Sequence, residues 1–205
     1  MVTTTTNKNL RGCRGGLILS DDPELGERLD AAVFPGIQGG PLPELICAKA
    51  VTFGEALRPE FADYAAAVLE NARTLSRVLR NRGYDIVTGG TDTPLVLVDL
   101  RGRGTPGHIA ERSLEAVGIT CNRNLVPGDT RGPATTSGLR FGTSAVTTRG
   151  MSTRELETVA DAIADVLDGL ERNSDSAVNG RAVRRVVSDL AAAFPIYSPH
   201  PASRS

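Results

Sequence analysis

The fold of this chain is best inferred from a polar segment near its start, which reads Thr3-Thr4-Thr5-Thr6-Asn7-Lys8-Asn9-Leu10-Arg11-Gly12-Cys13-Arg14-Gly15-Gly16. One lysine, Lys8, lies among hydroxyl groups and glycines, and the apolar run Leu17-Ile18-Leu19 follows directly. This order is typical of a reactive loop that leads into a buried strand. A lysine amine attacks carbonyl groups when desolvation or a nearby cation lowers its pKa, and Arg11 and Arg14 could supply that charge. Composition alone favours an ordinary polar surface segment.

Length and composition exclude several classes of protein. The 205 residues suffice for one domain with a substantial core, or for one domain with an arm. A net charge of −1 gives no overall field that favours nucleic acid or a membrane as partner. The three cysteines are widely spaced, so we expect reduced thiols, a cytoplasmic location and no metal site. No run is apolar enough to span a bilayer, and no signal peptide is expected.

Hydrophobic periodicity predicts helices that alternate with short strands. Strands are expected at 17–19, 84–87, 95–100 and 118–121, and helices after Asp22 and at 41–57, 60–82, 106–117 and 181–194. Ser152-Thr153-Arg154-Glu155 is a capping box that begins a further helix. Residues 173–180 read as a polar linker, and the proline-containing end reads as a loose tail. The pattern predicts an α+β domain in which helices cover a sheet.

Residues 3–16 resemble the active-site segment of the serine hydroxymethyltransferase family, which are fold-type I pyridoxal-phosphate enzymes. That segment has a threonine run and then His-Lys-Thr-Leu-Arg-Gly-Pro-Arg-Gly-Gly. Lys8 matches the lysine that forms the internal Schiff base with the cofactor aldehyde, and the resemblance makes Thr5 catalytic and Arg14 supporting. Asn7 replaces the family's histidine, which is linked to reaction course, so the resemblance leaves reaction specificity open more than cofactor attachment. Asn9 and Cys13 are two further departures.

A second motif, Phe34-Pro35-Gly36-Ile37-Gln38-Gly39-Gly40-Pro41-Leu42, is nearly identical to one in the same family. Two glycines before a helix let a backbone approach an anion closely, although the pair alone also fits a plain turn. In the family, the residues matching Gly39 and Gly40 contact the cofactor phosphate of the neighbouring subunit. The resemblance therefore implies a dimer with shared active sites.

Two more motifs name substrate-binding residues. Asn122-Arg123-Asn124-Leu125-Val126-Pro127-Gly128-Asp129 places Asn124 where the family contacts the folate pteridine, and an amide offers a donor and an acceptor together. Thr136-Ser137-Gly138-Leu139-Arg140-Phe141-Gly142-Thr143 places Arg140 where the family binds the amino-acid carboxylate, a task that suits a planar fork of donors. From the residues alone, the first segment also fits a polar loop, and Arg140 also fits a salt-bridge partner. Residues 131–133 lack the family's serine.

The resemblance covers residues 2–171 and only the C-terminal half of the family. It implies an α/β fold with three parts: residues 1–58 end the cofactor-binding large domain, 59–172 form a small α+β domain, and 173–205 form a linker, a helix and a tail. The family's aspartate for the pyridine nitrogen, its ring-stacking histidine, its phosphate-binding serine loop and its catalytic glutamate cannot be placed in this sequence.

The function implied is that of the C-terminal subunit of a split enzyme, with pyridoxal 5'-phosphate as cofactor. A partner chain would supply the N-terminal half in a dimer of heterodimers, which transfers a one-carbon unit between an amino acid and tetrahydrofolate. Two alternatives stay open. Asn7 and the altered segment 131–133 allow a folate-independent enzyme of the aldolase type. The missing half allows a non-catalytic regulatory remnant that binds a full-length relative.

Overall fold

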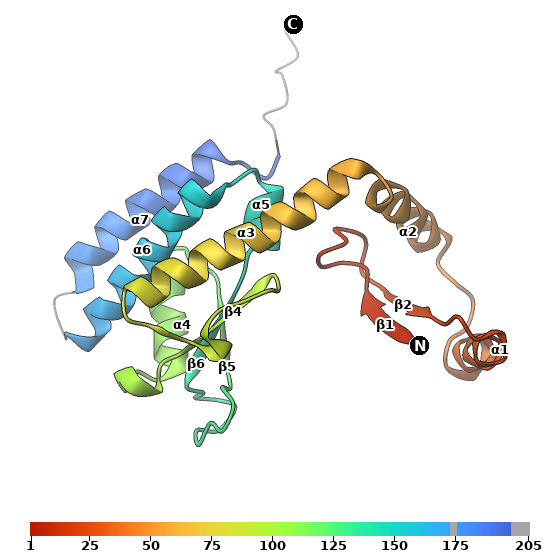
Figure 1. The fold of residues 1–205 in the computed structure, drawn as a ribbon, viewed down its shortest axis with the longest axis horizontal. Coiled ribbons are helices and arrows are strands. Elements are labelled where there is room, and N and C mark those ends of the chain that lie inside the picture. The colour runs from red at the N-terminus through yellow and green to blue at the C-terminus, as the bar shows by residue number, and fades with distance from the viewer. Residues whose placement is uncertain (173–175, 198–205) are drawn as a thin grey trace, which may run out of the picture. The chain divides into compact units, whose positions relative to one another are not determined.

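A computed structural model describes residues 1–172 and 176–197 of the chain (Figure 1). The chain divides into two compact units, residues 1–65 and residues 66–205. The three functional parts expected from sequence, which end at residues 58, 172 and 205, stay a prediction. Within the described ranges, no helix combines the length and the apolar character that a membrane crossing requires.

The first unit contains one hairpin and two helices. Strand β1 (Val2–Thr5) pairs antiparallel with β2 (Gly16–Leu19), so that Thr5 lies opposite Gly16. Helix α1 (Pro23–Ala31) begins where the Asp22 carboxylate accepts a hydrogen bond from the Leu25 amide, and a proline occupies its first turn. A π-helical turn, η1 (Ala32–Ile37), follows, and α2 (Pro43–Ala56) comes after the double glycine. Helix α3 (Pro59–Asn81) begins in this unit.

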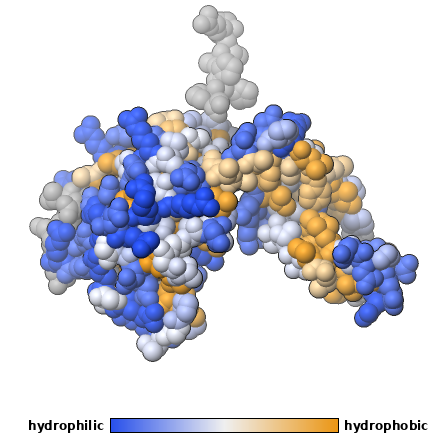
Figure 2. Space-filling model, viewed as in Figure 1, coloured by the Kyte–Doolittle hydropathy of each residue, from blue (hydrophilic) through white to orange (hydrophobic). Residues whose placement is uncertain are grey.

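The first unit has no apolar core of its own. In residues 1–65, all of which are described, only Thr6 and Thr52 are buried. Figure 2 shows hydrophobic residues, in orange, on the surface of this unit. The prediction that residues 17–19 form a buried strand is therefore wrong in its burial, because Ile18 is 42% exposed and Leu19 54% exposed. Within the unit, β1 is the only strand that pairs with β2, and neither face of the hairpin is covered by a core.

The second unit is a four-stranded antiparallel sheet covered by helices. The strands β3 (Asp85–Ile86), β4 (Leu95–Asp99), β5 (Asn122–Asn124) and β6 (Gly138–Gly142) have the spatial order β3-β4-β6-β5. Its helices are the rest of α3, α4 (Gly107–Ala116), α5 (Ser144–Thr148), α6 (Thr153–Glu171) and α7 (Ser176–Ala193), with short turns η2 (Val87–Gly89) and η3 (Arg101–Arg103). The predicted mixed α/β fold, with helices over a sheet, is confirmed.

Alternation along the two central strands separates a covered face from an open face. Val96, Val98, Leu139 and Phe141 are buried and belong to the core that also contains residues of α3, α4 and α6. The residues between them lie on the other face of the sheet. Arg140 is one of these, and it is exposed and pairs with Leu97 in the ladder between β4 and β6. Because successive side chains of a strand alternate between faces, the core position of Leu139 and Phe141 sends Arg140 outward.

Several boundaries differ from the prediction. The expected strand at 118–121 does not form, because Gly118 has φ +90 and the Ile119 amide turns back to the Leu114 carbonyl at the helix end. Pairing with β6 begins only at Asn122. The expected linker at 173–180 is helical from Ser176, while residues 173–175 and the tail after residue 197 lie outside the described residues. The capping box is confirmed, since Glu155 accepts hydrogen bonds from both the amide and the hydroxyl of Ser152.

Candidate functional site

The expected lysine segment is a closed loop built around one buried hydroxyl group. The Thr6 hydroxyl donates to the Cys13 carbonyl at 2.7 Å, and the Thr6 amide donates to the Gly15 carbonyl at 3.0 Å. The Gly12 amide returns to the Thr6 carbonyl at 2.8 Å. A side chain at Gly12 would meet Thr52 at 2.6 Å, so this close approach requires glycine. The last residue of the threonine run, Thr6, therefore has a structural role, because its hydrogen bonds hold the base of the loop together.

Lys8 lies at the exposed tip of this loop. The Arg11 amide donates to the Lys8 carbonyl at 2.8 Å and closes a tight turn in which Arg11 has φ 57. The side chain of Lys8 is exposed, and its amine has no hydrogen bond or ion pair with any residue the structure describes. An open hollow of about 500 Å³ is lined by Thr3, Thr4, Thr5, Lys8, Asn9 and Leu10. The structure thus brings Thr5 and Lys8 to one hollow, with Asn7 half-buried beside the lysine.

The basic residues near the loop have different partners. The guanidinium of Arg11 lies 4.0 Å from the centre of the Tyr64 ring and 5.8 Å from that of Phe61, which is a cation–π arrangement. Arg14 is exposed and lines a separate hollow beside β2 and α1. The Lys49 amine donates to the Gly16 carbonyl at 3.0 Å, and its side chain occupies the space that a Cβ at Gly15 would need. Sequence reasoning missed Lys49 and Tyr64, because neither residue belongs to a recognised motif.

The double glycine lies in an exposed segment of the first unit. Gly39 and Gly40 are exposed between η1 and α2, and a Cβ added to either would meet no atom within 4 Å. Packing among the described residues therefore gives no reason for glycine at these positions. Glycine at these two positions would allow a group from outside the described chain to approach the backbone closely.

The second cluster lies on the open face of the sheet in the other unit. Arg140, on β6, is exposed, and its Nη2 donates to Oδ1 of Asn122 at 3.3 Å. Asn122 lies directly opposite Arg140 in the ladder, and Asn124 lies opposite Gly138. No acidic side chain of the described part of the chain forms an ion pair with Arg140. The arginine fork is thus oriented by an amide and has no anionic partner among the residues that the structure describes. Asn122 was not expected as a site residue, although its motif includes it.

A half-buried carboxylate, that of Asp129, joins the two strands of this cluster. The Asp129 carboxylate accepts hydrogen bonds from the Ser137 hydroxyl at 2.7 Å, the Ser137 amide at 2.8 Å and the Arg131 amide at 3.0 Å. Desolvation acts to raise the pKa of Asp129, but these hydrogen bonds together outweigh it and lower the pKa to about 2. The carboxylate is therefore ionised at neutral pH and held by neutral donors.

The departure at residues 131–133 has a structural role. The Arg131 guanidinium donates to the carbonyls of Gly104 and Thr105, both at 3.2 Å. These contacts tie the loop after β5 to the turn that precedes α4. Arg131 is half-buried, and these contacts stabilise the backbone near the cluster.

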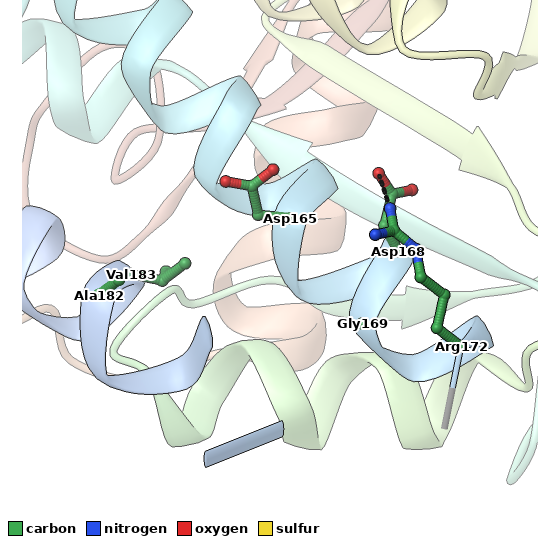
Figure 3. Close-up of a pocket in the computed structure, with 6 residues that line it drawn as sticks. All are labelled: Asp165, Asp168, Gly169, Arg172, Ala182 and Val183. Carbon is green, nitrogen blue, oxygen red and sulfur yellow. Dashed lines mark ion pairs between the residues drawn. The ribbon is translucent and has the colours of Figure 1, made fainter. Parts of the chain in front are cut away.

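Figure 3 shows a different hollow, of about 190 Å³, at the junction of α6 and α7. It contains none of the expected site residues, and its Asp168 belongs to a network that holds α3 and α6 together. Arg82 forms ion pairs with Asp161, Asp165 and Asp168, and the Tyr84 hydroxyl donates to Asp168 at 2.6 Å. Burial raises the pKa of Tyr84, and the bond to Asp168 adds to this effect. These groups pair with one another, which is typical of a structural network.

Comparison with known proteins gives a consistent result. The family model described as serine hydroxymethyltransferase matches residues 1–163. Proteins named serine hydroxymethyltransferase from Rhodospirillum centenum, Rhizorhabdus wittichii and Rickettsia canadensis are 57%, 54% and 51% identical to this chain. Each match covers 96% of this chain and 45–47% of the relative, so the chain spans about half the length of these relatives. Such coverage must reach into α7, and the expectation that the similarity ends near residue 171 was wrong.

Proposed function

Because the chain belongs to the serine hydroxymethyltransferase family, we propose that it carries the cofactor-attaching and substrate-binding part of a pyridoxal-phosphate enzyme. The reaction is transfer of a hydroxymethyl group between an amino acid and tetrahydrofolate. One observation supports this most strongly. Lys8 and Arg140, to which the motif resemblance assigns the cofactor and the substrate carboxylate, each lie on a hydrogen-bonded backbone, and neither charged group has a counter-ion among the described residues.

The loop of Lys8 fits a carbonyl-bearing cofactor. A primary amine on a well-fixed turn is the group that attaches an aldehyde covalently. The hydrogen bonds of Thr6 hold the loop, and the amine itself is free of protein partners in the described structure. Lys8 is thus the proposed attachment point, and the neighbouring Thr5 lines the same hollow.

The double glycine fits a phosphate. A backbone without side chains lets amide groups approach phosphate oxygens, and a helix follows at Pro43. Gly39 and Gly40 have open surroundings that would admit such a group. In the proposed assembly they bind the phosphate of the cofactor held by a neighbouring subunit.

The cluster on the sheet fits the two substrates. The guanidinium of Arg140 presents parallel donors, and Asn122 occupies one of them, so the carboxylate of an amino acid would meet a fork that is already oriented. Asn124 lies two residues further along β5 and would bind the pteridine ring through its amide. The side-chain nitrogen of Asn124 donates to the Leu125 carbonyl at 2.8 Å in this structure, which leaves its oxygen as an acceptor.

The cofactor, when bound, supplies the electron sink that stabilises a carbanion of the amino acid. The chain's own residues have simpler tasks. Lys8 attaches the cofactor, Arg140 holds the substrate carboxylate, and Asn124 holds the acceptor of the one-carbon unit. Asn7 takes the position of a histidine and offers hydrogen bonds without a group that titrates near neutral pH.

We further propose a partner that covers the first unit. Its apolar side chains are exposed, among them Phe34, Ile37, Leu42 and Leu57, and no apolar residue of residues 1–65 is buried. In the relatives, more than half of the length lies outside the matched region. A chain that supplies this region would bury the apolar surface of the unit and complete the active site, as a dimer of heterodimers.

A second candidate reaction is folate-independent cleavage of an amino acid, which Asn7 favours because it replaces the histidine that the resemblance implies. Reconstitution decides between the two. The chain is co-expressed with the region that precedes the lysine in a relative, and serine–glycine interconversion is measured with and without tetrahydrofolate. We expect turnover that depends on tetrahydrofolate and is lost in Arg140→Ala. Equal turnover without tetrahydrofolate would favour the alternative, and no turnover in a complex that holds the cofactor would contradict both.

A further inference from the structure

The Asp129 carboxylate joins the end of one strand to the start of another. Its Oδ1 accepts hydrogen bonds from the Ser137 hydroxyl and the Arg131 amide. Its Oδ2 accepts one from the Ser137 amide at 2.8 Å and a longer one from the Val126 amide at 3.4 Å. All four donors are neutral, and they come from both sides of the loop between β5 and β6. Such a carboxylate acts as a backbone anchor, since its donors belong to three residues spread along the connection, namely Val126, Arg131 and Ser137.

The segment on the other side of the anchor is also held. The Leu100 amide donates to the Ser137 carbonyl at 2.8 Å, so Ser137 is fixed through its amide, hydroxyl and carbonyl. The first amides of α4, those of Gly107 and His108, donate to the carbonyls of Thr136 and Thr135, both at 3.0 Å. The segment before β6 is therefore held from three places: the Asp129 loop, Leu100 after β4, and the first turn of α4.

The backbone within this segment is strained. Thr136 has φ 55, in the left-handed region that a β-branched residue adopts only at a cost, and it is buried. A conformation of this kind persists when its surroundings over-determine it. Gly107 allows the required approach, because a Cβ there would meet the Thr136 hydroxyl and the Gly138 carbonyl. The strain lies two residues before Gly138, which pairs with Asn124 at the near end of the β5–β6 ladder.

The anchor affects the two substrate-binding residues unequally. Arg140 lies in the middle of β6, where it pairs with Leu97 on one side and with Asn122 on the other. Asn124 is the last residue of β5, and the loop that Asp129 holds begins directly after it. Loss of the anchor would thus free the backbone beside Asn124 while the ladders on both sides still hold Arg140.

We propose that Asp129 is a positioning residue, which fixes loop 125–131 on the start of β6 and so places Asn124 for binding of the folate co-substrate. This inference rests on the proposed function. It assigns no chemistry to Asp129, which acts through Asn124. The carboxylate takes no part in the ladders of the sheet, in which β6 pairs with β4 on one side and with β5 on the other.

The test compares Asp129→Asn with Asp165→Asn in the reconstituted holoenzyme. Both variants replace a carboxylate that accepts hydrogen bonds, but Asp165 lies on α6 and pairs with Arg82, away from the loop. Three quantities are measured: hydrogen exchange at the amides of Arg131 and Ser137, the dissociation constant of tetrahydrofolate by calorimetry, and the dissociation constant of glycine by cofactor absorbance. Ser137→Ala, which removes one of the four bonds, replaces Asp129→Asn if that variant does not fold.

In Asp129→Asn we expect faster exchange at both amides and a tetrahydrofolate dissociation constant raised about tenfold, as for loss of one well-formed hydrogen bond, with that of glycine changed less than about twofold. Asp165→Asn should change neither constant. Unchanged exchange, or equal weakening of both ligands, would overturn the positioning role while leaving the proposed function intact. Failure of the unsubstituted holoenzyme to bind tetrahydrofolate would instead overturn both proposals.

Discussion

At the scale of single residues, Arg140 offers the clearest prediction about substrate. Arg140→Lys keeps the positive charge but loses the planar fork and its bond to Asn122. Breaking a desolvated charge pair commonly costs roughly 2–5 kcal/mol, and lysine should lose a part of that range. We expect much weaker binding of glycine or serine with unchanged cofactor content, measured by absorbance titration of the reconstituted complex. An unchanged dissociation constant would remove Arg140 from the site.

Asn7 is expected to influence the course of the reaction. The resemblance implies a histidine at this position in the family, and a histidine can carry a proton near neutral pH, whereas asparagine cannot. Asn7→His should therefore change the ratio of folate-dependent to folate-independent turnover in the reconstituted complex. The matched control is Asn9→His, on the exposed side of the same turn. If the ratio is the same in Asn7→His as in the unsubstituted complex, Asn7 only packs the loop.

The sequence predicts the candidate site residues that belong to a motif better than the residues that position them. Lys8 and Arg140 are identifiable because an amine in a threonine–glycine segment and a guanidinium in a short apolar strand belong to recognisable motifs. The roles of three other residues cannot be identified in this way. Asn122 depends on the strand register that places it beside Arg140, and Lys49 on a carbonyl 33 residues away in the chain. Tyr64 depends on the position of its ring under the Arg11 guanidinium. Contacts between distant segments leave no local pattern in a sequence.

At the scale of elements, the β5–β6 connection predicts a dependence of stability on pH. The folded-state pKa of Asp129 lies at about 2, below its ordinary value of 3.8. The anchor therefore contributes stability in full above the unfolded pKa, and that contribution is lost as pH falls from about 4 to about 2. We expect the urea midpoints of the unsubstituted chain and Asp129→Asn to differ most at neutral pH and to converge near pH 2. A difference independent of pH would contradict the anchor.

The capping box of α6 provides a second prediction at this scale. Glu155 accepts hydrogen bonds from the amide and the hydroxyl of Ser152 at 2.9 and 2.6 Å. Ser152→Ala should reduce the free energy of unfolding by about 1 kcal/mol, the usual cost of losing an N-cap hydroxyl. Thr158→Ala, at an exposed position further along the same helix, is the control for helix propensity. Equal effects of the two substitutions would show that the cap is not formed.

Long helices follow from sequence more closely than short strands. The apolar period of α3 and the box of α6 predict both helices to within a few residues, because many side chains share one face. Residues 118–121 have the composition of a strand. However, the amides of Gly118 and Ile119 donate to carbonyls at the end of α4, and the Ile119 side chain is buried in the core. Which three residues pair with β6 is decided by the neighbouring strand and not by their own propensity.

At the scale of the whole molecule, the exposed apolar surface of the first unit predicts association. Ile37 and Leu57 are both 86% exposed in a unit without a buried apolar side chain. We expect the isolated chain to sediment as oligomers or aggregates, and the double variant Ile37→Asp, Leu57→Asp to reduce this association. Tyr197→Asp, at an equally exposed position of the other unit, should not. A well-behaved monomer of the unsubstituted chain would argue against a partner for this surface.

The central claim is that Lys8 attaches the cofactor, and the composition of the chain makes it unusually easy to test. The chain contains two lysines, Lys8 and Lys49, and the amine of Lys49 donates to the Gly16 carbonyl at 3.0 Å. The reconstituted complex is reduced with borohydride, and the labelled peptides of this chain are mapped, with Lys8→Arg and Lys49→Arg in parallel. We predict a cofactor label on Lys8 that survives Lys49→Arg and disappears in Lys8→Arg. A label on Lys49, or a complex that holds the cofactor without a label on either lysine, would contradict the account.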